Sequence, residues 1–187
     1  IKVEGLPVNV LHNALAAKAG RVEFSYCVDR DWRSGIHARK FTETMNTRVI
    51  KVDSVSLDEL VNDDSEVSFI KLDLEGGEYD ALQGARNILK RDRPLVVFEH
   101  GGVEGANLYG YSNRAYYEFL NDYGYTVLDL LGRKVSVERF EKPLVWYYAA
   151  VDKQNERQTS LLESFPAILI SAAQELAIKN GIIFSAS

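Results

Sequence analysis

The sequence contains little cysteine, proline, methionine or histidine, with one, four, one and three of each among 187 residues. The single cysteine, Cys27, excludes an internal disulfide and favours a reducing compartment such as the cytoplasm. No run of about 18 apolar residues occurs, so no membrane-spanning helix is expected. The N-terminus lacks a basic segment followed by an apolar run, so no signal peptide is expected there either.

Positive charge is also scarce. Lysine and arginine number 22 against 27 acidic residues, a net charge of -5 at pH 7. Proteins that grip the nucleic-acid backbone usually have the opposite balance, so no nucleic-acid partner is predicted. Hydrophobic residues at 46% and charged residues at 26% are ordinary for a globular protein, which excludes disorder. The length suffices for one domain and is marginal for two.

Short β-rich runs alternate with helical runs, which predicts an α/β fold with a largely parallel sheet and helices on its faces. The clearest strands are residues 67–74 and 94–99, and a helix over 78–90 joins them in one right-handed β-α-β unit. Residues 101–110 are expected to form a glycine-rich loop, and residues 135–137 a β-arm. Further strands are expected at 8–15, 21–28, 48–52, 125–131 and 144–151. Further helices are expected at 57–61, with Ser56 as N-cap, and at 113–123, with Ser112 or Asn113 as N-cap.

The C-terminal segment, residues 155–187, is expected to be helical, with Pro166 dividing it or lying in the first turn of its second part. One apolar stripe on it consists of Ile168, Leu169, Ala172, Ala173 and Leu176. Such a stripe favours packing on the core over a homo-oligomer interface. We therefore expect one domain over residues 1–154, with residues 155–187 as a helical extension packed on it.

Charged residues gather at the ends of two strands of the β-α-β unit, the region where open α/β sheets bind ligands. Alternation places Lys71, Asp73 and Glu75 on one face of the first strand. Charges on one face of a central strand are costly unless they are paired or bound to a ligand. Glu99 and His100 end the second strand. We therefore predict that Asp73, Glu75, Glu99 and His100 converge as candidate catalytic residues.

Structural explanations compete with this reading. Lys71 and Asp73 could form an ion pair, and Glu78 could be a carboxylate favoured at a helix start. Tyr109 and Tyr111 belong to the glycine-rich segment, where they could act as a lid. With Glu78, these tyrosines are the candidate substrate-binding residues.

Several common sites are not predicted. No metal-ligand spacing accompanies His100, and the other histidines, His12 and His37, lie far away in the sequence. No metal site is therefore expected. The sequence also lacks the phosphate-binding Gly-x-x-x-x-Gly-Lys-Ser/Thr loop and the Gly-x-Ser-x-Gly elbow, which disfavours a P-loop enzyme and a serine hydrolase.

Four motifs occur in a fixed order. They are Leu-Asp-Glu-Leu at 57–60, Ile-Lys-Leu-Asp-Leu-Glu-Gly-Gly-Glu at 70–78, Leu-Gln-Gly-Ala at 82–85, and an Arg-Pro strand at 93–99 that ends in Glu. Their order and spacing resemble the FkbM family of S-adenosylmethionine-dependent methyltransferases. A weaker similarity at 12–15, His-Asn-Ala-Leu, extends the resemblance to about residues 8–152.

The resemblance implies a class I, Rossmann-like methyltransferase fold. That fold is a three-layer sandwich whose sheet is mostly parallel with an antiparallel last strand. The implied reaction is methyl transfer from S-adenosylmethionine to a hydroxyl of a small acceptor such as a sugar or polyketide. The resemblance also places Asn13, Ala14 and Asp73 at the cofactor, Asp73 with Glu75 at the transfer centre, and Glu99 with His100 towards the acceptor.

The glycine-rich cofactor loop of the family, and the acidic residue that ends its second strand, are not recognisable. The sequence is therefore expected to enter the fold at its third strand, as an N-terminally truncated part of a longer enzyme. The alternatives are a non-catalytic interaction or scaffold domain, and a gap filled by another chain or by the C-terminal helix. A metal-assisted hydrolase that uses Asp73, Glu75, Glu99 and His100 ranks last.

Overall fold

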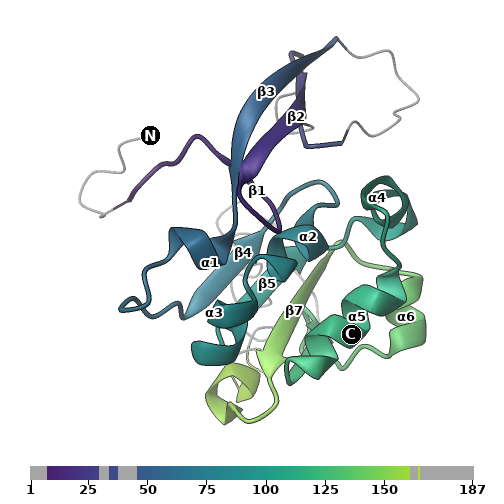
Figure 1. Ribbon diagram of the computed structural model, residues 1–187. Helices are drawn as coiled ribbons and strands as arrows, with labels where there is room; N and C mark the ends of the chain where they lie inside the picture. Colours follow the sequence, from purple (N-terminus) through teal and green to yellow (C-terminus); the bar gives the residue numbers. More distant parts are fainter. Residues whose placement is uncertain (1–7, 30–33, 38–45, 161–163, 165–187) are drawn as a thin grey trace, which may run out of the picture.

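The computed structural model describes residues 8–29, 34–37, 46–160 and 164 (Figure 1). Their strands form a three-stranded sheet, in the order β1-β3-β2, and a four-stranded sheet, in the order β4-β5-β7-β6. The strands are β1 (Ala14–Leu15), β2 (Gly20–Cys27), β3 (Thr47–Val55), β4 (Phe69–Leu72), β5 (Leu95–Glu99), β6 (Tyr125–Asp129) and β7 (Tyr147–Asp152). The helices are α1 (Leu57–Leu60), α2 (Glu78–Gln83), α3 (Arg86–Arg91), α4 (Gly102–Tyr109), α5 (Asn113–Asp122) and α6 (Val137–Glu141).

The smaller sheet is built on an antiparallel hairpin of β2 and β3, with β1 pairing parallel to β3. This hairpin projects from the rest of the molecule at the top of Figure 1. Its apolar side chains Val49 and Ile50 are exposed. The strand expected at residues 8–15 is much shorter than predicted, since of these residues only Ala14 and Leu15 pair with β3, opposite Ser54 and Val55.

The larger sheet contains the predicted β-α-β unit. Strands β4 and β5 pair in parallel, from Phe69 opposite Leu95 to Leu72 opposite Phe98. Strand β7 is antiparallel to both of its neighbours, β5 and β6. The last strand is thus antiparallel, as expected, but a mostly parallel sheet is not confirmed, because β4 and β5 are the one parallel pair of neighbours in this described sheet.

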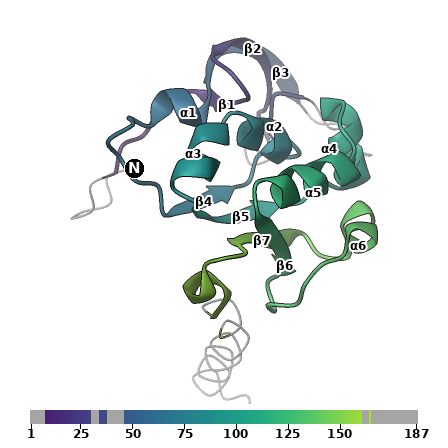
Figure 2. The same cartoon turned by 60° about the horizontal axis from the view of Figure 1, so that its bottom comes forward.

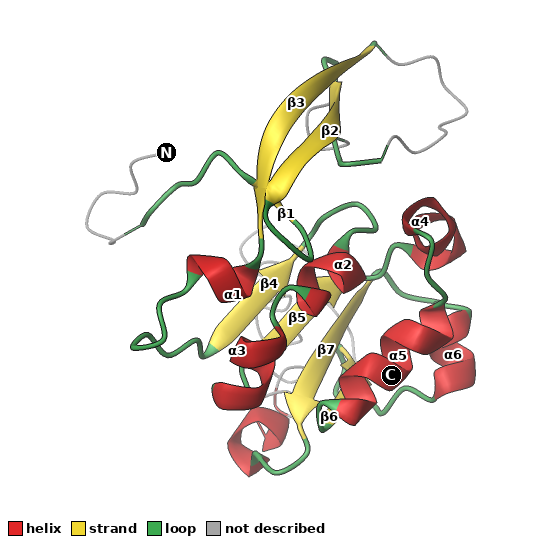
Figure 3. Cartoon of the chain, in the orientation of Figure 1, coloured by secondary structure: helices red, strands yellow, loops and turns green. Residues whose placement is uncertain are grey.

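Helices α2, α3 and α5 lie on the same side of the larger sheet (Figures 2 and 3). The core between them contains buried side chains from the helices, such as Leu82, Leu89 and Leu120, and from the strands, such as Leu72 and Phe98. The opposite face of the sheet carries a small cluster centred on Leu128, Ala149 and Val151. The described residues thus show two layers, and the expected three-layer sandwich is not confirmed.

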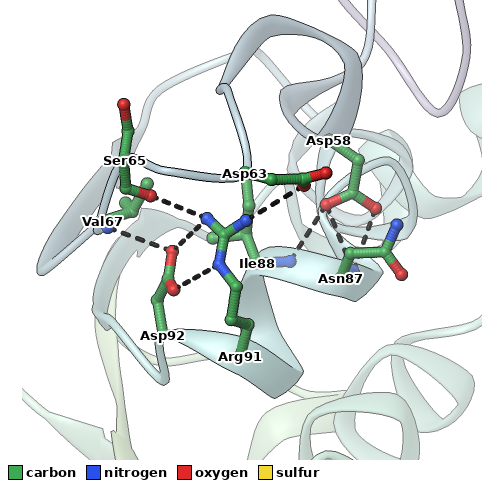
Figure 4. Close-up of polar contacts among 8 residues, drawn as sticks. All are labelled: Asp58, Asp63, Ser65, Val67, Asn87, Ile88, Arg91 and Asp92. Atoms are coloured by element: carbon green, nitrogen blue, oxygen red, sulfur yellow. Dashed lines mark hydrogen bonds and ion pairs between the residues drawn. The ribbon is translucent and has the colours of Figure 1, made fainter.

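Polar contacts join α1 to α3 (Figure 4). Both carboxylate oxygens of Asp58 accept the backbone N–H of Asn87, at 3.1 and 3.0 Å, and one also accepts that of Ile88 at 3.0 Å. The residue at the cap position of α3, Ala85, makes no side-chain cap bond. Asp58 therefore supplies from another helix the acceptor that an N-terminal turn needs. This contact gives a structural reason for the Leu-Asp motif at 57–58.

Local signals predicted several helix starts correctly. Ser56 caps α1 in a reciprocal capping box with Glu59, and Ser112 caps α5 through Ala115. The β-arm expected at residues 135–137 is confirmed only at its start, where Lys134 bridges Leu128 and the N–H of Val135 donates to the carbonyl of Val127. At Val137 it is wrong, because Ser136 caps α6 there. The helix predicted over residues 78–90 is instead two helices, because α2 ends at Gly84 and α3 begins after Ala85. A Cβ on Gly84 would lie 2.5 Å from the carbonyl oxygen of Ala16.

The glycine-rich segment 101–110 is a helix, α4, and not the expected loop. Its glycines permit close packing rather than mobility. A Cβ on Gly101 would lie 2.6 Å from the Cα of Gly76, and Gly110 ends the helix in the left-handed conformation. Both are uses for which glycine is the favoured residue.

Residues 156–160 of the C-terminal segment are helical. Gln158 ties them to the domain, since its side chain donates to the carbonyl of Arg93 and accepts from the backbone N–H of Asp152, both at 2.9 Å. Pro166 and the apolar stripe from Ile168 to Leu176 lie outside the described residues. Within the part of the chain that is described, no helix has the length and apolar character needed to cross a bilayer.

Candidate active site

The site lies where β4 ends and the chain turns into α2. Along β4 the side chains of Ile70 and Leu72 are buried while that of Lys71 is exposed, so the predicted alternation of faces is confirmed. In the turn, Glu75 has a φ of 54° and Gly76 a φ of 106°. Because a φ of 106° strains any residue with a Cβ, glycine is required at position 76.

Glu78 is fully buried at the start of α2. One of its carboxylate oxygens accepts the backbone N–H of Leu74 at 2.7 Å and that of Gly76 at 3.3 Å. The side chain therefore holds the turn that carries Glu75. This geometry favours the structural reading of Glu78, and its predicted contact with a substrate stays a prediction.

Three carboxylates meet at the strand ends. Oxygens of Asp73, Glu75 and Glu99 all lie within 4.8 Å of one another, and we call these residues the carboxyl cluster. One oxygen of Asp73 is 2.7 Å from the Lys71 ammonium and accepts the hydroxyl of Tyr147 at 3.0 Å. Tyr147 reaches the cluster because it lies opposite Glu99 in the register of β5 and β7.

The pKa values of Glu99 and Asp73, two of the three carboxyls in the cluster, are shifted in opposite directions. Burial raises the pKa of Glu99 to about 7, and its hydrogen bond with Asp73 and the charge of Glu75 add to this effect. Burial also acts to raise the pKa of Asp73. Hydrogen bonds from Lys71, Tyr147 and Glu99 outweigh it, so the pKa of Asp73 lies below its ordinary value. Near neutral pH the pair therefore holds an ionised Asp73 beside a Glu99 that gives and takes a proton.

His100 is turned into the core instead of joining the carboxyl cluster. Its Nδ1 accepts the backbone N–H of Gly102 at 3.0 Å, and its Nε2 lies 3.0 Å from the carbonyl oxygen of Phe140. A neutral ring with its proton on Nε2 satisfies both partners. Burial lowers the pKa of His100 to about 4. The ring therefore anchors the end of β5, on the face away from Glu99.

Tyr109 and Tyr111 both pack against the turn after β4. The hydroxyl of Tyr111 donates to the carbonyl oxygen of Gly76 at 3.1 Å. A Cβ on Gly77 would lie 3.0 Å from the hydroxyl of Tyr109, whose ring meets His37 edge-on at 4.5 Å. Tyr109 also lines a cavity of about 430 Å³. These contacts fix both tyrosines to the turn, and the predicted lid role stays untested.

Asn13 and Ala14 line a separate cavity of about 370 Å³ between β1 and the hairpin, together with Phe24 and Ile50. Among the residues that the structure describes, this cavity shares no lining residue with the carboxyl cluster. The expected place of Asn13 and Ala14 beside an adenine therefore remains a prediction.

A further cavity, of about 340 Å³, adjoins the end of β5. It is lined by residues 100–104 and 143–146, and the side chain of Trp146 at its edge is 67% exposed. The backbone carbonyl of Trp146 accepts the N–H of His100 at 2.6 Å. Sequence reasoning missed Trp146 and Tyr147, because only the antiparallel pairing of β7 with β5 brings them to this edge.

The carboxyl cluster suits a cationic ligand. Its spacing could hold a metal ion, but the Lys71 ammonium already neutralises part of its charge, and exposed acidic groups commonly gather without an ion. We therefore assign no metal ligands. An organic cation such as a sulfonium needs no coordination geometry, and its charge complements that of Asp73 and Glu75.

Comparison with known families identifies the chain. The family model described as methyltransferase FkbM domain matches residues 8–127, which is more than half of the 187 residues. The protein therefore belongs to the FkbM methyltransferase family, as the four motifs indicated. Neither the curated proteins nor the solved structures contain a match.

Proposed function

We propose that this protein is an S-adenosylmethionine-dependent O-methyltransferase that acts on a hydroxyl of a small molecule such as a sugar or polyketide. The observation that carries the proposal is the Asp73–Glu99 pair at the ends of two parallel strands, with one carboxyl ionised and the other titrating at about 7. A group that titrates near neutral pH is well matched to accepting a proton from a hydroxyl.

S-adenosylmethionine, when bound, supplies an electrophilic methyl group on a positively charged sulfur. The chemistry of the carboxyl cluster fits this group, because Asp73 and Glu75 present negative charge at the strand ends. We propose that these two residues face the donor and that Asn13 and Ala14 contact its adenine. Membership of a methyltransferase family, which implies a methyl donor, supports the choice of ligand.

The other site residues would act on the acceptor. The ionised form of Glu99 would receive the hydroxyl proton on its carboxylate, which makes the acceptor oxygen a better nucleophile. The cavity beside Trp146, beyond the end of β5, offers apolar side chains such as Val103 and Leu144 for the body of the acceptor. His100 would keep Glu99 in place through its two backbone hydrogen bonds. The remaining demand is alignment of the reacting atoms.

The alternative is a methyltransferase-like domain that serves as a non-catalytic scaffold. The structural contacts of Glu78 and His100, two of the predicted site residues, favour it. The enzyme proposal requires a small-molecule acceptor, and the scaffold proposal a binding partner. Both place the protein in the cytoplasm, which the single cysteine, Cys27, supports. They differ in whether the chain binds the methyl donor.

Calorimetric titration of S-adenosylhomocysteine into the 187-residue chain separates the two proposals. The enzyme proposal expects saturable binding, and an Asp73→Asn variant that transfers no methyl group to any acceptor the wild type accepts. The variant should keep its unfolding temperature, because the Lys71–Asp73 ion pair is 51% and 40% exposed and such pairs contribute at most about 1 kcal/mol.

The scaffold proposal expects no heat of binding from this chain. A large fall in the unfolding temperature of Asp73→Asn would instead support the purely structural ion pair. A matched variant, Asp63→Asn, changes an equally charged side chain that is fully exposed and far from the cluster. It should alter neither binding nor stability.

A further inference from the structure

Two donors converge on one oxygen of Asp73. The Lys71 ammonium lies 2.7 Å from this Oδ2 atom, and the Tyr147 hydroxyl donates to it at 3.0 Å. The ammonium also lies 5.8 Å from the centre of the Tyr147 ring. Lys71 belongs to β4 and Tyr147 to β7. The two donors to this carboxylate therefore come from strands that do not pair with each other.

Glu99 has a different set of neighbours. It lies opposite Tyr147 in the β5–β7 register and shares a hydrogen bond with Asp73. The charges that act on it most come from the acidic groups of Asp73, Glu75 and Glu78. Hydrogen bonds to a charged carboxylate favour its ionised form, whereas nearby negative charge favours protonation. The asymmetry of the pair therefore arises from where the two donors point.

We propose that Lys71 and Tyr147 are positioning residues that fix the negative charge on Asp73 and so leave the exchangeable proton on Glu99. Their role is to decide which of the two carboxyls exchanges a proton with the acceptor hydroxyl. This role in catalysis rests on the proposed function, but the placement of the proton itself does not depend on it.

A purely structural role for these residues makes a different prediction. The Lys71–Asp73 pair is exposed enough that its contribution to stability is small. If the contacts did not determine which carboxyl holds the proton, their removal would leave the titration of the pair unchanged. If they place the proton, their removal spreads the neutral titration step over both carboxyls, because coupled groups then share one proton more evenly.

Carbon-13 NMR of the side-chain carboxyls in the full 187-residue chain, without cofactor or acceptor, tests the proposal. The signals are assigned with Asp73→Asn and Glu99→Gln. In the wild type, the Glu99 carboxyl carbon should shift through a step at about 7, while the Asp73 carbon stays constant until acidic pH. In Lys71→Met and in Tyr147→Phe, the chemical shift of the Asp73 carboxyl carbon should also change measurably over the same neutral pH range.

Tyr117→Phe is the matched control, because the Tyr117 hydroxyl donates to the carbonyl of Val135 and not to a residue of the carboxyl cluster. It should reproduce the wild-type titration. The proposal is overturned if the Asp73 carbon already follows the neutral step in the wild type, or if both variants leave it constant. Lys71 is half exposed, so its replacement does not threaten folding, and far-ultraviolet circular dichroism verifies this.

Failure of the proposed function gives a distinct result. A chain that binds no S-adenosylhomocysteine but shows the expected titrations refutes the enzyme proposal and leaves the proton placement standing. If the chain binds the cofactor and transfers methyl groups, Tyr147→Phe should change the pH profile of kcat more than KM, since it alters which group accepts the proton and not how the acceptor binds.

Discussion

At the residue scale, Glu99 and His100 are adjacent in the chain, yet their pKa values are shifted in opposite directions. Burial raises the pKa of Glu99 to about 7 and lowers that of His100 to about 4. In both residues burial disfavours the charged form, which is the anion for glutamate and the cation for histidine. The two side chains point to opposite faces, so one lies at the carboxyl cluster while the other fills the core.

The raised pKa of Glu99 predicts a pH dependence of stability. Its pKa in the folded chain lies above the ordinary value of 4.5. The stability that Glu99 contributes is therefore fully present below 4.5 and is lost as the pH rises through about 7. Urea unfolding of the wild type and of Glu99→Gln across this range should show the wild type losing stability relative to the variant.

The comparison must be a difference between the two proteins, because His100 has the opposite effect. The depressed pKa of His100 gives stability that is present above its ordinary value of 6.5 and is lost as the pH falls towards about 4. This contribution is common to both proteins and cancels. Parallel stability curves for wild type and Glu99→Gln would contradict the raised pKa of Glu99.

At the element scale, the family motifs divide into those that build the fold and those that form the site. The Leu-Asp motif belongs to the first kind, since Asp58 caps α3 from α1 (Figure 4). Gly84 belongs there too, because a Cβ would lie 2.5 Å from the carbonyl oxygen of Ala16. The Asp-x-Glu segment at 73–75 supplies two of the three residues of the carboxyl cluster, the candidate site. Membership of the family therefore does not by itself make a motif residue catalytic.

Asp58→Ala should destabilise the protein by about 0.5–2 kcal/mol, the usual cost of losing a helix cap. The backbone N–H groups of Asn87 and Ile88 would lose their acceptor. Chemical unfolding monitored by circular dichroism measures this cost. Asp63→Ala, which removes a carboxylate that is fully exposed beside Arg91, is the control and should change little. Equal effects of both substitutions would argue against the cap.

At the scale of the whole molecule, the two sheets carry different candidate binding sites. The larger sheet carries the carboxyl cluster and the cavity beside Trp146. The smaller sheet carries the cavity lined by Asn13 and Ala14. Strand β4 lies at an edge of the larger sheet as described. The carboxyl cluster is thus at the end of an edge strand and its parallel neighbour.

Deletion of residues 155–187 should destabilise the domain. Gln158 makes two hydrogen bonds to Arg93 and Asp152, which contribute about 1 kcal/mol each. Differential scanning calorimetry should show a lower unfolding temperature for the deletion, and Gln158→Ala should reproduce part of it. If the deletion altered only the oligomeric state measured by light scattering, the segment would be an interface and not a packed extension.

The sequence by itself determined the family, the β-α-β unit, the helix starts at Ser56 and Ser112, and the meeting of Asp73, Glu75 and Glu99. These features depend on local patterns. Alternation sets the faces of a strand, a capping residue sets a helix start, and parallel neighbours end at the same edge. The sequence also placed Lys71 correctly on the exposed face of β4, opposite the buried Ile70 and Leu72.

Only the tertiary structure decided the roles within the site. It turned His100 into the core, joined Tyr147 to Asp73 across 74 positions of sequence, and folded the glycine-rich segment into α4 against Gly76. Each outcome depends on which distant backbone or side chain comes within a few ångströms. The acidity of Glu99 has the same origin, since burial and neighbouring charge exist only once the strands have assembled.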